Sequence, residues 1–221
     1  MLLSHKLWWI GKARQLGFSW ASCVFALWMC KFNEVAKGLI LSQGEEEAWD
    51  MIDKCRFIDD HLPDWLRETR DPDSRSTIGW PSVGSEIKAL PSTEKGGRST
   101  DATFVFCDEI EYHPEAERNF GALKPTIDAG GWFIGISTGD PLKVTSFLKH
   151  RYLEAKSGDS LFKAAFFGWE CRPGRDENWY KNATLDLADW QKQGEYPETE
   201  DDFLAVVKSR KFFDMDILNE M

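Results

Sequence analysis

Short apolar runs alternate along this chain with longer segments of helical spacing, and this alternation limits the fold more than any other feature. The runs predicted as strands span residues 7–10, 38–42, 103–107 and 132–137. The segments predicted as helices span residues 19–32, 45–62, 114–123 and 144–156. Strands that alternate with helices predict an α/β fold, in which helices cover both faces of a mostly parallel sheet. Residues 77–80 and 86–90 are predicted to form a small antiparallel pair.

The composition limits the class of protein. With 221 residues, of which 42% are hydrophobic, the chain can bury one substantial core. Its net charge of −10 argues against a protein that grips DNA with its whole surface. Five cysteines without a CxxC pair and four scattered histidines indicate reduced thiols in a cytoplasmic compartment and no zinc site.

The apolar stretch at residues 20–30 is too short to span a bilayer and ends at Lys31. We therefore expect a buried helix here rather than a membrane or signal segment, and no association with a membrane. The side chains predicted on its buried face are Ala21, Val24, Phe25 and Trp28.

The residues between the first strand and the first helix have the composition of a loop that cradles phosphate. Such a loop holds a triphosphate through successive backbone N–H groups and the N-terminus of the following helix. Gly17 permits the close approach, and Ser19 supplies a hydroxyl for a magnesium ion. In the common P-loop a lysine directly precedes that hydroxyl, but here the position is Phe18, and Lys12 is the available replacement. The predicted ATP-binding residues are Lys12, Ala13, Arg14, Gln15, Leu16, Gly17, Phe18 and Ser19.

Arg14 lies in the same loop and is predicted to sense or neutralise the γ-phosphate. The alternative interpretation of the whole segment is a strand, a turn and a helix whose basic residues are incidental.

Two acids, Asp108 and Glu109, follow the apolar run at residues 104–107. In a nucleotide hydrolase the first carboxylate holds magnesium, and the second orients and deprotonates the attacking water. The alternative is that these acids only cap the end of a strand at the surface.

Two further segments have weaker signals. Arg98, in a glycine-bearing loop, could complete the site of a neighbouring subunit, or it could be a solvated charge. Ser137, Thr138 and Gly139 end the last predicted strand and could respond to hydrolysis through their hydroxyls, or they could form a simple turn.

Taken in order, these segments resemble the ATPase domain of bacteriophage terminase large subunits. The stretches that carry the resemblance are residues 12–19, 39–43, 97–100, 104–109 and 131–138. Residues 169–174 and 195–199 are similar to the segment that joins this ATPase to the family's nuclease. The resemblance covers almost the whole chain from about Leu7.

The resemblance implies a P-loop NTPase fold of the ASCE or RecA-like type, with residues 1–160 as the ATPase domain and residues 161–221 as a small linker subdomain. It also implies ATP and Mg²⁺ as cofactors and a homo-oligomeric ring at the procapsid portal in the host cytoplasm. The implied partners are the portal protein, the terminase small subunit and viral double-stranded DNA. The implied catalytic residues are Glu109, Arg14 and Arg98, with Ser19 and Asp108 at the metal and residues 137–139 coupling hydrolysis to movement.

Two departures from the family pattern are expected. The family's adenine-binding segment normally precedes the phosphate loop, and its nuclease domain should begin near residues 213–221, so cleavage of DNA is not expected from this chain. Two alternatives to the motor remain at this point. One is a helicase-like P-loop translocase, and the other is a fragment that binds nucleotide or assembles without hydrolysing ATP.

Overall fold

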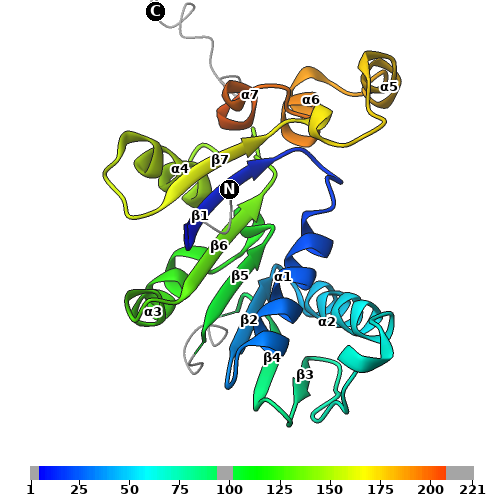
Figure 1. Cartoon of the computed structure of the whole chain (residues 1–221). Coiled ribbons are helices and arrows are strands. Elements are labelled where there is room, and N and C mark those ends of the chain that lie inside the picture. The colour runs from blue at the N-terminus through cyan, green and yellow to red at the C-terminus, as the bar shows by residue number, and fades with distance from the viewer. Residues whose placement is uncertain (1–4, 94–101, 208–221) are drawn as a thin grey trace, which may run out of the picture.

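The computed structural model describes residues 5–93 and 102–207. One seven-stranded sheet forms its centre, with the order β3-β4-β2-β5-β6-β1-β7 (Figure 1). The strands are β1 (Leu7–Lys12), β2 (Lys37–Ser42), β3 (Thr77–Trp80), β4 (Ser85–Pro91), β5 (Phe104–Asp108), β6 (Trp132–Ser137) and β7 (Lys163–Phe167). The helices are α1 (Phe18–Phe32), α2 (Glu45–Asp60), α3 (Ala116–Asp128), α4 (Phe147–Ser157), α5 (Glu177–Ala183), α6 (Asp189–Glu195) and α7 (Glu200–Leu204).

The sheet is parallel except at one edge, where β3 runs antiparallel to β4. The predicted antiparallel pair is therefore confirmed, and β4 also pairs in parallel with β2, which joins the pair to the main sheet. Strand β6 lies between β1 and β5. Because parallel strands end at the same edge of a sheet, this order brings the ends of β1, β6 and β5 next to one another.

Helices cover both faces of the sheet, as the sequence predicts (Figure 1). Alternate residues of a strand point to opposite faces, so Ile40 packs with the residues of α1 and α2 while Leu39 and Leu41 pack on the other side. The second core contains Leu123 of α3 and Leu148 of α4. Among the described residues, no helix is both long enough and apolar enough to cross a bilayer.

The predicted buried face of α1 is wrong. Val24 and Trp28 are 52% and 44% exposed, whereas Cys23, Leu27 and Cys30 are buried. The helix is apolar on nearly every side, so the spacing of its apolar residues does not identify the face that meets the sheet.

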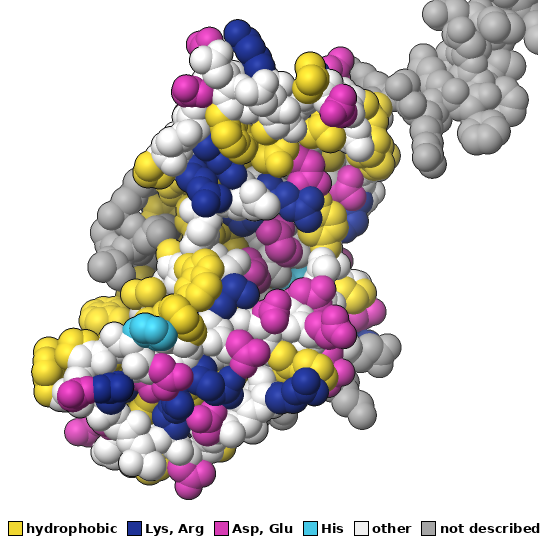
Figure 2. All heavy atoms as spheres, turned by 90° about the vertical axis from the view of Figure 1, so that its right-hand side faces the viewer, with side chains coloured by type: hydrophobic (Ala, Val, Ile, Leu, Met, Phe, Trp, Pro, Cys, Tyr) yellow, Lys and Arg dark blue, Asp and Glu magenta, His cyan; other side chains and the backbone are white. Residues whose placement is uncertain are grey.

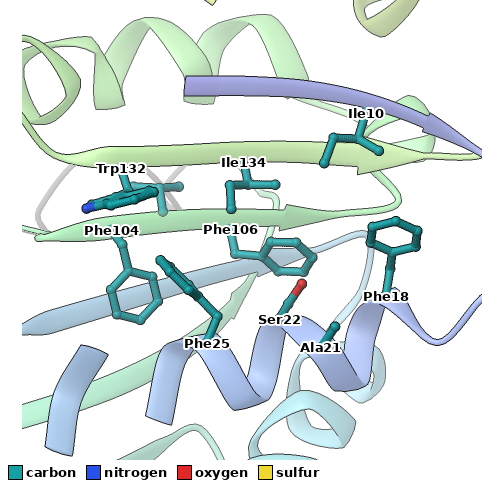
Figure 3. Close-up of a pocket in the computed structure, with 10 residues that line it drawn as sticks. Ile10, Phe18, Ala21, Ser22, Phe25, Phe104, Phe106, Trp132 and Ile134 are labelled. Atoms are coloured by element: carbon teal, nitrogen blue, oxygen red, sulfur yellow. The ribbon is translucent and has the colours of Figure 1, made fainter. Parts of the chain in front are cut away.

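An apolar cavity of about 200 Å³ lies between α1 and strands β5 and β6. Figure 3 shows Phe18 and Phe25 of α1 pointing towards Phe106 and Ile134 of the sheet across this space. Its lining is almost wholly apolar, so this cavity offers nothing that could perform hydrolysis.

Helix α3 is longer than predicted because it continues through Pro125 to Asp128. Helix α4 begins at Phe147 rather than at 144, because the hydroxyl of Ser146 accepts a hydrogen bond from the N–H of Lys149 and caps the helix. Strand β7 was not predicted. It lies in the part of the chain assigned to a linker, and it pairs with β1 at the edge of the sheet.

Candidate active site

The loop between β1 and α1 has the conformation expected of a phosphate cradle. Strand β1 ends at Lys12, helix α1 begins at Phe18, and two residues between them have positive φ angles. Gly17 has φ 86°, which glycine adopts without steric cost, and Gln15 has φ 58°. The free N–H groups of the first turn of α1 therefore face the mouth of a cleft of about 630 Å³.

Ser19 and Asp108 meet across this cleft, 89 residues apart in the sequence. The hydroxyl of Ser19 donates a hydrogen bond of 2.8 Å to Oδ2 of Asp108. The other carboxylate oxygen, Oδ1, is buried and has no hydrogen-bond partner among the described residues. A carboxylate with a free oxygen beside a hydroxyl fits Mg²⁺, which binds one or two protein oxygens together with water and substrate phosphate.

Glu109 lies at the centre of the cleft and contacts three different strands. Its Oε1 pairs with the ammonium of Lys12 at 2.6 Å. Its Oε2 accepts hydrogen bonds from the hydroxyl of Ser137 at 2.8 Å and from the N–H of Thr138 at 3.2 Å. The position of β6 between β1 and β5 makes this arrangement possible.

The two neighbouring acids have opposite electrostatic environments. Burial raises the pKa of Asp108 and the charge of Glu109 raises it further, against the hydrogen bond from Ser19. Burial would also raise the pKa of Glu109, but the charge and hydrogen bond of Lys12 outweigh it, and the pKa falls below its usual range. Glu109 is therefore ionised at neutral pH and able to accept a proton.

Arg14 does not face the phosphate cradle in this structure. Its guanidinium pairs with the carboxylate of Glu195 in α6 at 2.5 Å, and its backbone N–H donates to the Glu195 carbonyl at 2.8 Å. The N–H of Ala13 donates to the carbonyl of Phe167 at 2.8 Å. The segment after β7 thus holds the loop in place.

Gly139 connects the end of β6 to the same C-terminal segment. A Cβ atom added at Gly139 would lie 2.5 Å from the carbonyl oxygen of Phe203 in α7, and one added at Gly11 would lie 2.6 Å from its ring. Phe203 is fully buried between these two glycines. The residues predicted for coupling therefore contact both Glu109 and the C-terminal segment.

Phe18, which occupies the usual place of the loop lysine, packs its ring against Phe167 with 5.0 Å between centroids. It supplies no charge to the cleft, which leaves Lys12 as the cation at the base of the loop. Leu16 also lines the cleft. Arg98 lies outside the described residues, so its predicted role stays a prediction.

Several residues of the site were not predicted. Lys54 of α2 and Arg172, after β7, line the same cleft as Lys12 and Ser19. Figure 2 shows basic and acidic side chains gathered in the hollow between the C-terminal helices above and the layer of α1 and α2 below. Ser42 and Gln43 line an adjoining cleft of about 320 Å³, and their place after an apolar strand could have identified them. Nothing in the local sequence marks Lys54 or Arg172.

Solved structures share this architecture. The ATPase domain of the Thermus phage P74-26 large terminase is 20% identical, with a TM-score of 0.68, 87% of this chain covered and 88% of that chain. The large terminase of bacteriophage HK97 is 16% identical, with a TM-score of 0.63 and 90% and 42% covered. The ADP complex of a large terminase from a thermophilic bacteriophage is 11% identical, with a TM-score of 0.68 and 97% and 52% covered.

This chain thus spans about half the length of the two longer terminases. No protein-family model and no curated protein matches the sequence. The similarity in structure covers the loop, the acid pair and the C-terminal helices together, since it includes most of the chain. The fold of this chain is the P-loop NTPase fold of phage large terminase ATPase domains.

Proposed function

We propose that this chain is the ATPase motor domain of a phage terminase large subunit, which hydrolyses ATP with magnesium to drive viral double-stranded DNA into the procapsid. One observation carries the proposal. Asp108 is joined to Ser19 of the helix that begins the phosphate cradle, while its neighbour Glu109 is joined to Lys12 at the base of the cradle. An acid for magnesium and an acid for water therefore lie on the same cleft.

The contacts suggest how the residues act in turn. The N–H groups of the loop and the ammonium of Lys12 would bind the β- and γ-phosphates, and Ser19 and Asp108 would hold Mg²⁺, which neutralises the charge that develops on the phosphates. Once Lys12 turns to phosphate, Glu109 loses its ion pair, and its pKa rises towards the usual value. Glu109 then becomes a stronger base for the attacking water, while Ser137 and Thr138 keep it oriented.

The wider assignments follow from the same proposal. Large terminases are among the proteins of similar fold, and one was solved with ADP and with ATP-γ-S. We infer for this chain a homo-oligomeric ring that works with a portal protein, a terminase small subunit and viral DNA. Its place would be the host cytoplasm, at the procapsid portal.

Magnesium-dependent ATP hydrolysis by the full chain tests the proposal. We expect Glu109→Gln to lower turnover by about 100-fold or more, since a positioned base contributes that much. We expect Lys12→Ala to weaken both binding and turnover. Glu117→Gln, the same change at an exposed residue of α3, is the control and should leave turnover unchanged.

Turnover that survives in Glu109→Gln would contradict the assignment of the base. Tight ATP binding by the parent chain without turnover would instead support a fragment that binds nucleotide but does not hydrolyse it. A parent chain that binds no ATP would exclude the nucleotide site altogether.

A further inference from the structure

The charges around the cleft are not balanced. Of the four basic residues that line it, Lys12 pairs with Glu109 and Arg14 pairs with Glu195. Arg172 has no ion pair with a carboxylate among the described residues, and the ammonium of Lys54 donates only to the carbonyl of Asp50 at 3.3 Å. The cleft therefore has two uncompensated cations, one on α2 and one after β7.

Arg172 is bound directly to the phosphate loop. One terminal nitrogen of its guanidinium donates to the carbonyl of Gln15 at 2.6 Å. Gln15 is the residue of the loop with a positive φ angle, two positions before Gly17. A guanidinium has five N–H donors in a planar fork that matches the geometry of phosphate, so one bond to the loop leaves others for an anion.

Arg175 provides a comparison within the same turn. It too donates to the loop, to the carbonyl of Arg14 at 3.0 Å. However, its guanidinium lies over the ring of Trp179, 4.1 Å from the centroid, and it does not line the cleft. Partial burial and the charge of Arg172 lower the pKa of Arg175, which shows that the two cations lie close together.

We propose that Arg172 binds the terminal phosphate of the nucleotide and so makes the segment after β7 part of the phosphate site. This inference rests on the proposed function, because it assigns a further residue to the same nucleotide site. It accounts for an exposed arginine held against a loop that already contains two basic residues.

The contact would make the C-terminal segment sensitive to the number of phosphates. ATP would engage the free donors of Arg172, whereas AMP would leave them in water. The segment also contacts the loop through Arg14 and Glu195, so occupation of the cleft by ATP would be felt beyond residue 172.

The test measures the binding of fluorescent ATP, ADP and AMP analogues to the full chain in the presence of magnesium. We expect Arg172→Gln to raise the Kd for ATP by about tenfold or more, because hydrogen bonds to charged groups are among the stronger ones. The change should be smaller for ADP and absent for AMP. Arg175→Gln is the matched control and should change the three affinities little and to the same extent.

Equal effects of Arg172→Gln on all three nucleotides, or equal effects of the two variants on ATP, would overturn the inference, since Arg172 would then only support the loop. If Arg172→Gln does not fold, Arg172→Lys provides the same test, because it keeps the charge and loses the planar fork. A parent chain that binds ATP while Arg172→Gln binds it equally well would overturn this inference and leave the proposed function intact. A parent chain that binds no ATP would overturn both.

Discussion

Glu109 has a left-handed backbone conformation, with φ 52° and ψ 46°. Residues other than glycine that adopt such angles cost of order 1 kcal/mol or more and persist only where the surroundings hold them. Here the ion pair with Lys12 and the hydrogen bonds from Ser137 and Thr138 hold the side chain. The strained backbone aims Glu109 into the cleft, whereas Asp108, one residue earlier, faces Ser19.

Asp108→Asn is expected to stabilise the fold and abolish hydrolysis. The raised pKa means that the folded chain binds the proton of Asp108 more tightly than the unfolded chain does. The charge of Asp108 therefore costs stability as the pH rises from its ordinary pKa through the raised value, and asparagine avoids that cost at neutral pH. Urea unfolding should show a higher midpoint for the variant, and turnover should fall by about 100-fold or more.

The same comparison at lower pH provides a control. Protonation of Asp108 removes its charge from the parent as well, so the difference in unfolding midpoint should shrink as the pH falls towards 4. A variant that is less stable than the parent at pH 7 would show that the carboxylate stabilises the fold and that its environment has been misjudged.

His113 is expected to make stability depend on pH. Burial lowers the pKa of His113 from its ordinary 6.5 to about 4, and its Nε2 is 2.7 Å from the carbonyl oxygen of Asp108. Because the unfolded chain binds the proton more readily, stability is lost as the pH falls from 6.5 towards 4. The free energy of unfolding should drop by about 2 kcal/mol between pH 7 and pH 5, at about 1.4 kcal/mol per pKa unit.

Urea unfolding of His113→Gln should show a flatter profile over the same range, since glutamine can keep a hydrogen bond to Asp108 but does not titrate. An unchanged profile would mean that another group causes the acid sensitivity.

At the residue scale, the sequence predicted the chemistry better than the contacts. Ser19, Asp108 and Glu109 could be identified because each follows an apolar run whose end must lie at the same edge of the sheet. The partner of Arg14 could not be, because Glu195 is 181 positions away and no local pattern connects the two. Only the fold brings such residues together.

At the scale of elements, α7 is attached to the sheet by one aromatic side chain. Phe203 lies in a slot between Gly11 of β1 and Gly139 at the end of β6, and it is fully buried. A methyl group at either glycine would overlap Phe203 atoms, and the ring is too tightly enclosed to move aside cheaply.

Gly11→Ala should therefore destabilise the fold by about 1–3 kcal/mol, which is typical of overpacking in a well-filled core. Gly121→Ala is the matched control. A Cβ atom at Gly121, in α3, meets nothing within 4 Å, so alanine should stabilise that helix by about 0.5–1 kcal/mol. Thermal or urea unfolding of both variants measures the difference, and equal stability of the two would show that Phe203 yields easily.

The elements themselves were predicted unevenly. Strands β2, β5 and β6 carry continuous apolar runs and are found close to their expected bounds. Strand β7 is an edge strand with a short and partly polar sequence, so its apolar signal was too weak to see. The buried face of α1 was missed for the opposite reason, because too many of its residues are apolar.

At the scale of the whole molecule, the two edges of the sheet differ in their connection to the site. The β7 edge continues into helices that contact the phosphate loop, whereas β3 and β4 form the far edge (Figure 1). The strand order that produces this difference could not be read from the sequence, because the order depends on long-range pairing rather than on local pattern.

Nucleotide should consequently protect the two edges unequally. With saturating ATP analogue and magnesium, we expect slower hydrogen exchange of backbone amides in the loop at residues 12–19 and in α6 and α7, since both contact the loop or Gly139. Peptides that cover β3 and β4 provide the internal control and should not change. Protection confined to the loop would show that the C-terminal helices do not respond to the nucleotide.

The ion pair between Lys12 and Glu109 has a consequence for the rate at which the site fills. The cleft already contains a carboxylate where a phosphate is to bind, so a ligand that recruits Lys12 must exchange with Glu109 rather than enter an open position. Exchange of this kind includes a step inside the protein, the release of the ammonium, that does not depend on the concentration of ligand. The observed rate of productive binding should therefore level off at high nucleotide concentration, at a ceiling set by the chain itself.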